Sequence, residues 1–169
     1  KSIALLENVE SIDFCFSGIS DLTALHSLKK LRRLDISGST ATDLEPLRHL
    51  TGLRSLNLSQ MPNIHTLPDW IGKLPLEYLD LSYLSLDMLP LWLPDLGLEF
   101  SRSKYHPKQG IQLYKTTSKT DDMNIFYQSQ EAIHTWFSQR LLPLNEMKVV
   151  FLGDNEDLFC LEDLLGPVH

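Results

Sequence analysis

A chain of 169 residues is long enough for one folded domain, or for one domain with an appendage. Its hydrophobic content of 43% and charged content of 22% are ordinary for a globular protein. The net charge of −7 argues against nucleic acid as a partner, and no apolar run approaches the ~20 residues that a membrane-spanning helix needs. The first residue is Lys1 rather than a methionine, and no signal-peptide pattern follows, so we expect a fragment of a longer chain.

Four hydrophobic runs near the N-terminus repeat at an almost constant spacing. They begin at Val9, Leu31, Leu53 and Leu76, with spacings of 22, 22 and 23 residues, and each is apolar at its first, fourth and sixth positions. A period in the twenties with this pattern predicts a solenoid in which each turn buries its apolar face against the next. The expected fold class is α/β, with short parallel strands that start near residues 11, 33, 55 and 78.

The polar positions of each run alternate with the buried ones, so they are expected to line the concave face of the solenoid. Position three supplies Ser11, Arg33, Ser55 and Tyr78, and position five supplies Asp13, Asp35, Asn57 and Asp80. After each strand a second apolar set follows at spacings of three or four, as in Leu22, Leu25 and Leu28. That spacing predicts a short helix or a 3-10 turn on the convex side.

The phrases LRRLDISGS, LRSLNLSQM and LEYLDLSYL, with LPDWIGKL and LPLWLPDL between or after them, resemble the leucine-rich-repeat family in its short, bacterial-like form. The resemblance covers about residues 5–100 and implies a scaffold that binds a protein on its concave face. The family usually has Asn at the ninth position of each repeat, whereas this chain has Ser17, Ser39, Met61 and Leu84. Because Met and Leu side chains form no such hydrogen bonds, buried polar groups there need other partners. The pattern fails at Leu98, where Ser101 replaces the fourth, apolar residue.

Residues 101–122 are polar and turn-rich, which predicts a loop or a degenerate repeat around Ile111 and Leu113. A helical pattern follows over 123–140, with Asp122 in a position to cap it and an apolar face that includes Ile133 and Phe137. We expect this helix to cover the open end of the solenoid; a helix that binds a partner is the alternative.

The stretch LNEMKVVFLGDNEDLFCLEDLLG predicts a strand over 147–152, a turn at Gly153 and a helix over 158–165, which is the setting of a phosphate-binding P-loop. The order of repeats, QSQEAIHTWFSQ and LNEMKVVFLGD is similar to the junction between leucine-rich repeats and the Ras-like Roc domain of Roco proteins. The similarity covers roughly residues 125–155. We therefore treat 123–169 as a C-terminal unit of helix, strand and degenerate P-loop.

The P-loop chemistry itself is missing. Leu158, Phe159 and Cys160 stand where the motif requires glycine, lysine and Ser or Thr. Leu158 has a Cβ where the backbone must curl around phosphate, Phe159 carries no charge, and Cys160 is a poor ligand for Mg²⁺. Nearby carboxylates would repel an anion. We expect neither GTP nor ATP to bind, and no cofactor.

Metal and catalytic sites are not indicated. The six histidines are scattered, and Cys15 and Cys160 form no C-x-x-C pair. Two unpaired thiols fit a reducing compartment and so a cytoplasmic location. The row of Asp13, Asp35 and Asp80, interrupted by Asn57, is interpreted as a solvated acidic stripe.

The sequence therefore favours a non-enzymatic protein-binding module. The residues expected to bind the partner on the concave face are Arg33, Asp35, Arg54, Asn57, Tyr78 and Asp80. The alternative is the regulatory N-terminal part of a Roco-type protein whose nucleotide-binding domain is truncated or inactive. The sequence does not set the oligomeric state.

Overall fold

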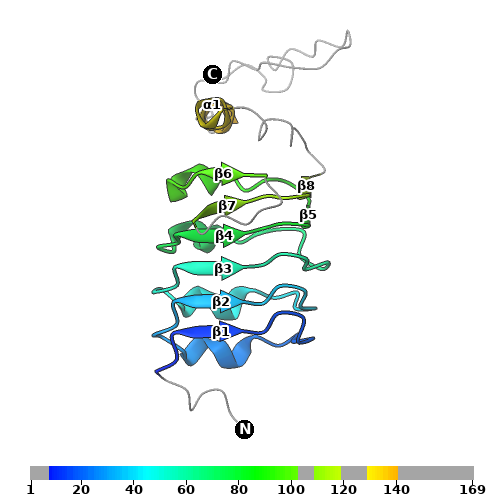
Figure 1. Ribbon diagram of the computed structural model, residues 1–169, viewed down its shortest axis with the longest axis vertical. Helices are drawn as coiled ribbons and strands as arrows, with labels where there is room; N and C mark the ends of the chain where they lie inside the picture. Colours follow the sequence, from blue (N-terminus) through cyan, green and yellow to red (C-terminus); the bar gives the residue numbers. More distant parts are fainter. Residues whose placement is uncertain (1–7, 103–108, 119–128, 141–169) are drawn as a thin grey trace, which may run out of the picture.

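The computed structural model describes residues 8–102, 109–118 and 129–140, which form a stack of short parallel strands (Figure 1). Within these residues, six strands make one sheet in the order β1-β2-β3-β4-β7-β6. The first four are β1 (Ser11–Asp13), β2 (Arg33–Asp35), β3 (Ser55–Asn57) and β4 (Tyr78–Asp80), so the predicted starting residues are confirmed. Beyond them lie β7 (Gly110–Gln112) and β6 (Phe100–Ser101), and every neighbouring pair is parallel.

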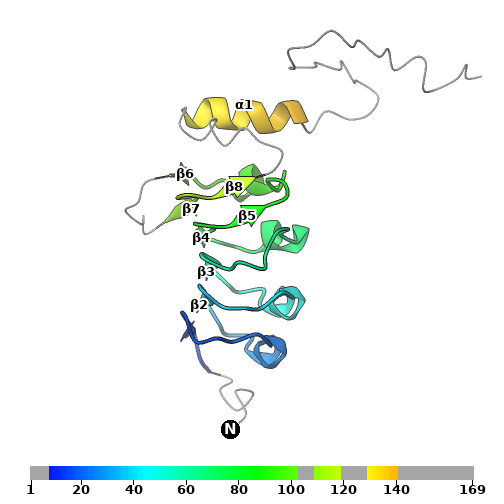
Figure 2. The same ribbon diagram turned by 90° about the vertical axis from the view of Figure 1, so that its right-hand side faces the viewer.

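Short 3-10 helices lie on the opposite side of the stack from the sheet (Figure 2). They are η2 (Thr23–Ser27), η3 (Glu45–His49), η4 (Asp69–Lys73) and η5 (Leu93–Leu96), and they confirm the 3-10 form of the predicted convex segments. Each has only four or five residues, and 3-10 helices commonly occur as short pieces of this kind. We call the sheet surface that points away from these helices the concave face and the other surface the convex side.

The core lies between the sheet and the 3-10 helices and runs through the whole stack. Strands β1, β2, β3, β4 and β7 each have a central leucine or isoleucine, and four of these stack in register from Leu34 through Leu56 and Leu79 to Ile111, all at most 1% exposed. Each 3-10 helix adds one buried residue: Leu25, Leu47, Ile71 and Leu93. Because each repeat buries its apolar residues against those of its neighbours, the repeats are stable only as a stack.

The fifth position of the sheet is taken by β7 rather than by the strand that comes next in sequence. Residues 100–101 form β6 on the outer side of β7. The chain therefore first forms the sixth strand of the sheet and then returns to form the fifth, between β4 and β6. Gly110 makes this insertion possible, because its φ is +101° and a Cβ there would lie 2.7 Å from the Glu99 carbonyl oxygen. Ile111 and Leu113 are fully buried, and a second small sheet pairs β5 (Ser85–Leu86) with β8 (Thr117–Ser118).

At the ninth repeat position, Met61 and Leu84 point into the core, where they are at most 1% exposed. Backbone groups around Leu84 bond to one another: Leu84 N–H donates to the Leu81 carbonyl, and Thr117 N–H donates to the Leu84 carbonyl. The array continues through Met61 and Leu84, and its departure from the regular order of strands comes later, where β7 lies between β4 and β6. At the equivalent position of the fifth turn, Thr116 Oγ1 donates to the Leu81 carbonyl oxygen at 2.7 Å.

Helix α1 (Gln130–Arg140) lies across the end of the stack beside β6 (Figure 2). Its Gln130 side chain pairs with both backbone groups of Phe100, accepting from the N–H and donating to the carbonyl, each at 3.0 Å. Phe137 stacks on the Phe100 ring, with centroids 6.0 Å apart, and Ile133 is fully buried. The amide of Gln130 thus occupies hydrogen-bonding groups that β6 would otherwise leave open at the sheet edge.

The helix starts at Gln130 within the described residues, and Ser129 Oγ accepts from Ala132 N–H at 3.2 Å as an N-terminal cap. Residues 119–128 lie outside the described part, and with them the predicted Asp122 cap. The strand expected over 147–152, the turn at Gly153 and the degenerate P-loop also lie outside it, as does Cys160.

Candidate functional site

The concave face presents two rows of side chains across the strands. The register aligns Ser11, Arg33, Ser55, Tyr78 and Gly110 in one row. The second row contains Asp13, Asp35, Asn57, Asp80 and Gln112. The first four members of each row were predicted from the period; Gly110 and Gln112 were not, because 32 residues rather than 22 or 23 separate Leu79 from Ile111.

The Asp and Asn residues of the second row end the strands. In β1 to β4 each of these side chains accepts a hydrogen bond from the backbone N–H two residues later. The four bonds join Asp13 to Cys15, Asp35 to Ser37, Asn57 to Ser59 and Asp80 to Ser82, at 2.8–2.9 Å. This Asx turn explains why Asp or Asn recurs at position five. The row therefore has a structural role whether or not a partner also touches it.

Asn57 links the acidic row where it was expected to interrupt it. Its Nδ2 donates to Asp35 Oδ2 at 2.7 Å, while Ser37 Oγ donates to Asp35 Oδ1 at 2.6 Å. With the backbone N–H of Ser37, the Asp35 carboxylate accepts three hydrogen bonds. The side chains over β2 and β3 are thereby held in one orientation, which lowers the entropy that a partner would have to remove on binding.

Tyr78 marks the end of the open part of the concave face. Its hydroxyl donates to Asp80 Oδ2 at 2.9 Å, and Asp80 is only 1% exposed. Burial raises the pKa of the Tyr78 hydroxyl well above its usual value, and the negative charge of Asp80 raises it further. Gln112 in the next strand is also buried. The accessible part of the face therefore lies over β1, β2 and β3, with Tyr78 at its limit.

The two predicted arginines occupy different places. Arg33 is exposed on the concave face, where its Nε donates to Ser11 Oγ at 3.4 Å. Arg54 precedes β3 and forms an ion pair with Glu77, which precedes β4; both side chains are about half exposed. Exposed ion pairs contribute little to stability, so Arg54 is held loosely and is accessible to a partner.

A ridge of residues with positive φ was not anticipated from the sequence. The eighth position of each repeat adopts the left-handed conformation, and the five residues of this ridge are Phe16, Gly38, Gln60, Tyr83 and Lys115. Only Gly38 signals that geometry in the sequence. The ridge exposes two aromatic rings, Phe16 at 63% and Tyr83 at 44%. The Tyr83 ring meets Tyr114 edge to face at 5.4 Å, and Lys115 Nζ lies within 5.6 Å of both ring centres.

Neither metal-binding groups nor membrane-spanning segments emerge from the part of the chain that the structure describes. No three His, Cys, Asp or Glu residues converge there in a way that could hold an ion. No helix there has the length and apolar character needed to cross a bilayer. Cys15 is exposed and unpaired in the same set of residues.

Comparisons with known proteins bear on the fold. No protein-family model matches the chain, and no curated protein matches it. Among solved structures, it is similar to a leucine-rich-repeat protein from Leptospira interrogans, with a TM-score of 0.55 and 24% identity over 67% of this chain and 27% of that one. It is also similar to an internalin from Listeria monocytogenes, with a TM-score of 0.50 and 19% identity over 72% of this chain and 39% of that one.

These similarities, together with the parallel register and the 3-10 convex side, establish the architecture. The chain folds as a leucine-rich-repeat solenoid of the α/β class, as the period of its sequence predicted. It spans 27% and 39% of the two matched proteins, so it corresponds to only part of each.

Proposed function

We propose that this chain is a non-enzymatic protein-binding module whose partner docks on the concave face over β1, β2 and β3. The observation that carries the proposal is the in-register display of polar side chains over these strands, which their own hydrogen bonds hold in place. A rigid polar surface loses little entropy on binding and suits recognition of another folded surface.

Arg33 and Tyr78 are the proposed anchors, because Arg and Tyr side chains carry a large share of the energy in many interfaces. Arg33 is exposed, whereas Tyr78 is half-buried and oriented by Asp80. Asp35, Asn57 and the exposed Arg54 complete the surface. We propose that Asp80 contributes by orienting Tyr78, since it is almost inaccessible itself.

Site-specific photo-crosslinking in the native organism tests the proposed face. A benzophenone amino acid placed at Ser55, which lies between Arg33 and Tyr78 in the same row, probes the concave face, and the same group at Arg48, an exposed residue of η3, is the convex control. We expect a discrete adduct from position 55 that position 48 does not give. A discrete adduct from position 48 alone, or from neither position, contradicts the proposal.

The captured protein is then titrated in purified form against variants. Arg33→Ala is expected to weaken binding about tenfold or more, which corresponds to ~1.4 kcal/mol. Arg48→Ala removes the same charge from the convex side and should leave the dissociation constant within about twofold. Equal losses for the two variants would show that general charge, and not the concave face, drives association.

The second candidate is the regulatory front end of a Roco-type protein. The observation in its favour is that α1, which bears the EAIHTWF signature, caps the array, so a following domain would begin at the capped end. The gene sequence beyond the codon for His169 tests it. A Ras-like domain there supports this candidate, and a stop codon or an unrelated domain contradicts it.

Two further properties belong to the same proposal. We place the chain in the cytoplasm, because the exposed thiol of Cys15 would be oxidised in an oxidising compartment. The division at residues 100 and 122 is also proposed, although β7 and β8 continue the array as far as residue 118. Fractionation of the native cells, with immunodetection of the chain, tests the location; recovery outside the cytoplasm would contradict it.

A further inference from the structure

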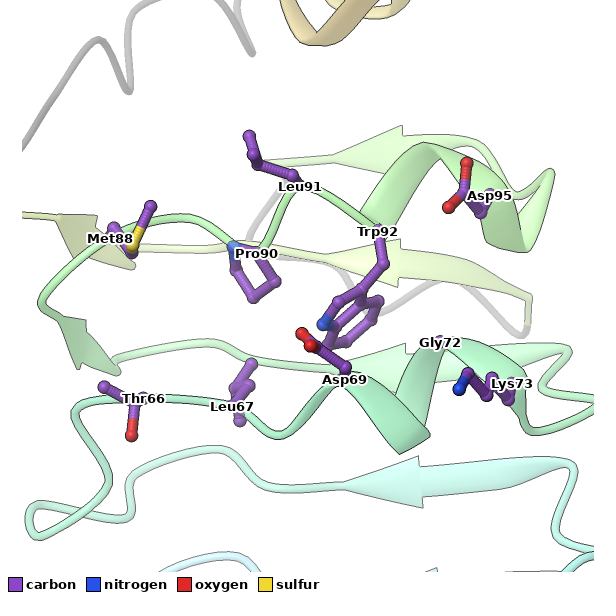
Figure 3. Close-up of a pocket in the computed structure, with 10 residues that line it drawn as sticks. All are labelled: Thr66, Leu67, Asp69, Gly72, Lys73, Met88, Pro90, Leu91, Trp92 and Asp95. Atoms are coloured by element: carbon purple, nitrogen blue, oxygen red, sulfur yellow. The ribbon is translucent and has the colours of Figure 1, made fainter. Parts of the chain in front are cut away.

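A groove of about 570 Å³ lies on the convex side between η4 and η5, away from the proposed partner face (Figure 3). Its size falls within the ~300–1,000 Å³ range of ligand sites. One end is mostly apolar: Leu67, Met88, Pro90 and Leu91 line it, together with Thr66. Met88 is 52% exposed and is one of only three large apolar side chains that the described residues expose strongly. A flexible thioether at the mouth of a groove suits contact with an apolar side chain.

Trp92 and Asp69 line the middle of the groove (Figure 3). The Trp92 ring packs directly on Gly72, where an added Cβ would lie 2.9 Å from the ring. The preceding repeat places Trp70 in the same position, and its Nε1 donates to Glu45 Oε1 at 2.9 Å. Asp69 takes the place of that glutamate but is one methylene shorter. The Trp92 Nε1 is buried without a hydrogen-bond partner among the described residues.

The Asp69 carboxylate therefore accepts no hydrogen bond from the Trp92 N–H. On the same side of the molecule, Asp21 and Asp43 each accept a backbone N–H, from Thr23 and Glu45 respectively, at 2.8 Å. Among the described residues, neither a hydrogen bond nor an ion pair engages the side chain of Asp69. This leaves a partner-free carboxylate beside an aromatic ring in the groove.

The far end of the groove is close to neutral, because Lys73 of η4 and Asp95 of η5 bring opposite charges to it. The unbalanced charge is therefore that of Asp69, next to the Trp92 ring. A cation is attracted both by a carboxylate and by the face of an indole. The molecule itself uses the second contact elsewhere, where the Arg140 guanidinium lies 3.6 Å from the Trp136 ring centre. The net charge of −7 also favours the binding of a positively charged ligand.

We propose that this groove is a second docking site, which takes a segment of a partner protein in which an Arg or Lys adjoins apolar residues. The cationic side chain lies against Asp69 and Trp92, and the neighbouring apolar side chain packs on Met88 and Pro90. The site is independent of the concave face, so a failure here leaves the proposed function standing.

Calorimetric titration of the full chain with two capped heptapeptides tests the proposal. One peptide is Gly-Leu-Arg-Leu-Arg-Leu-Gly, and the other has Glu in place of each Arg. We expect the basic peptide to bind with a dissociation constant below about 1 mM and the acidic one at least tenfold more weakly. Equal binding of the two peptides, or no binding of the basic peptide at 1 mM, overturns the proposal.

Matched variants locate the binding. Asp69→Asn is expected to weaken the basic peptide at least about fivefold. Asp43→Asn removes the same charge from the same side of the molecule, and because Asn also accepts the Glu45 N–H, the fold is preserved. It should change the affinity less than about twofold, as should Arg33→Ala on the concave face. Equal weakening by Asp69→Asn and Asp43→Asn would mean that the peptide responds to net charge and not to the groove.

Discussion

Replacing Leu56 with alanine should destabilise the solenoid far more than replacing its neighbour Ser55. Leu56 is fully buried and lies in register between Leu34 and Leu79, which are buried as well. Truncating a buried leucine removes its transfer free energy and leaves a cavity, at a cost of ~2–5 kcal/mol. Ser55 points to the concave face, where substitutions usually change stability by less than about 0.5 kcal/mol.

Equilibrium unfolding in urea, followed by far-ultraviolet circular dichroism, measures the difference. With a urea slope of ~2 kcal/mol per molar, Leu56→Ala should lower the midpoint by about 1–2.5 M, and Ser55→Ala by no more than about 0.25 M. Because each repeat is stabilised by its neighbours, the loss should affect the whole stack and not β3 alone. Equal midpoint shifts, or a larger shift for Ser55→Ala, would mean that the strand register is inverted.

Three further substitutions test particular contacts. Asp69→Glu should give the Trp92 N–H an acceptor and raise the free energy of unfolding by ~0.5–1.5 kcal/mol in urea titrations; no gain would contradict the geometry. Gln130→Ala should cost ~1–3 kcal/mol and speed amide exchange at Phe100, and unchanged exchange would refute the cap. Folding raises the pKa of Tyr78. The contribution of its hydroxyl to the free energy of unfolding is therefore complete below pH ~10 and is lost as the pH rises through the pKa of the folded state. Tyr78→Phe should therefore lose less stability than the wild type at high pH; parallel pH profiles would contradict this.

The strands could be predicted from the sequence because their burial is local and periodic. Leu34 and Leu56 recur at the same position of the repeat and face the same core, so spacing alone gave the strand starts and the register. The 3-10 helices followed from the same leucine spacing. The cap by α1 could be anticipated as well, since a solenoid leaves an apolar end that something must cover.

Other features depend on contacts that spacing does not encode. The insertion of β7 between β4 and β6 requires a glycine at 110 and the return of the chain, in the same direction, to a position of the sheet that β6 had passed; neither alters the local apolar pattern. The positive-φ ridge includes Phe16 and Tyr83, residue types that give no hint of a left-handed backbone.

The candidate site was predicted by position but not by role. The alternation of polar and apolar residues placed Asp35, Asn57 and Asp80 on the concave face, where the structure also has them. It did not show that their side chains cap the strand ends. An Asx turn is a local hydrogen bond that leaves the same Asp or Asn signal as a binding row would. The Trp92 groove could not be predicted from the sequence because residues of two repeats form it. The Trp92 N–H lacks an acceptor there because the side chain of Asp69 is one methylene shorter than that of Glu45.

Hydroxyl-radical footprinting of the chain, alone and with its purified partner, measures which face of the solenoid the partner covers. Tyr78 reports on the concave face and Trp70 on the convex side, and both rings are partly exposed in the unbound chain. We expect a saturating concentration of the partner to slow the oxidation of Tyr78 severalfold and to leave that of Trp70 unchanged. Protection of Trp70 with no change at Tyr78 would contradict a concave binding face.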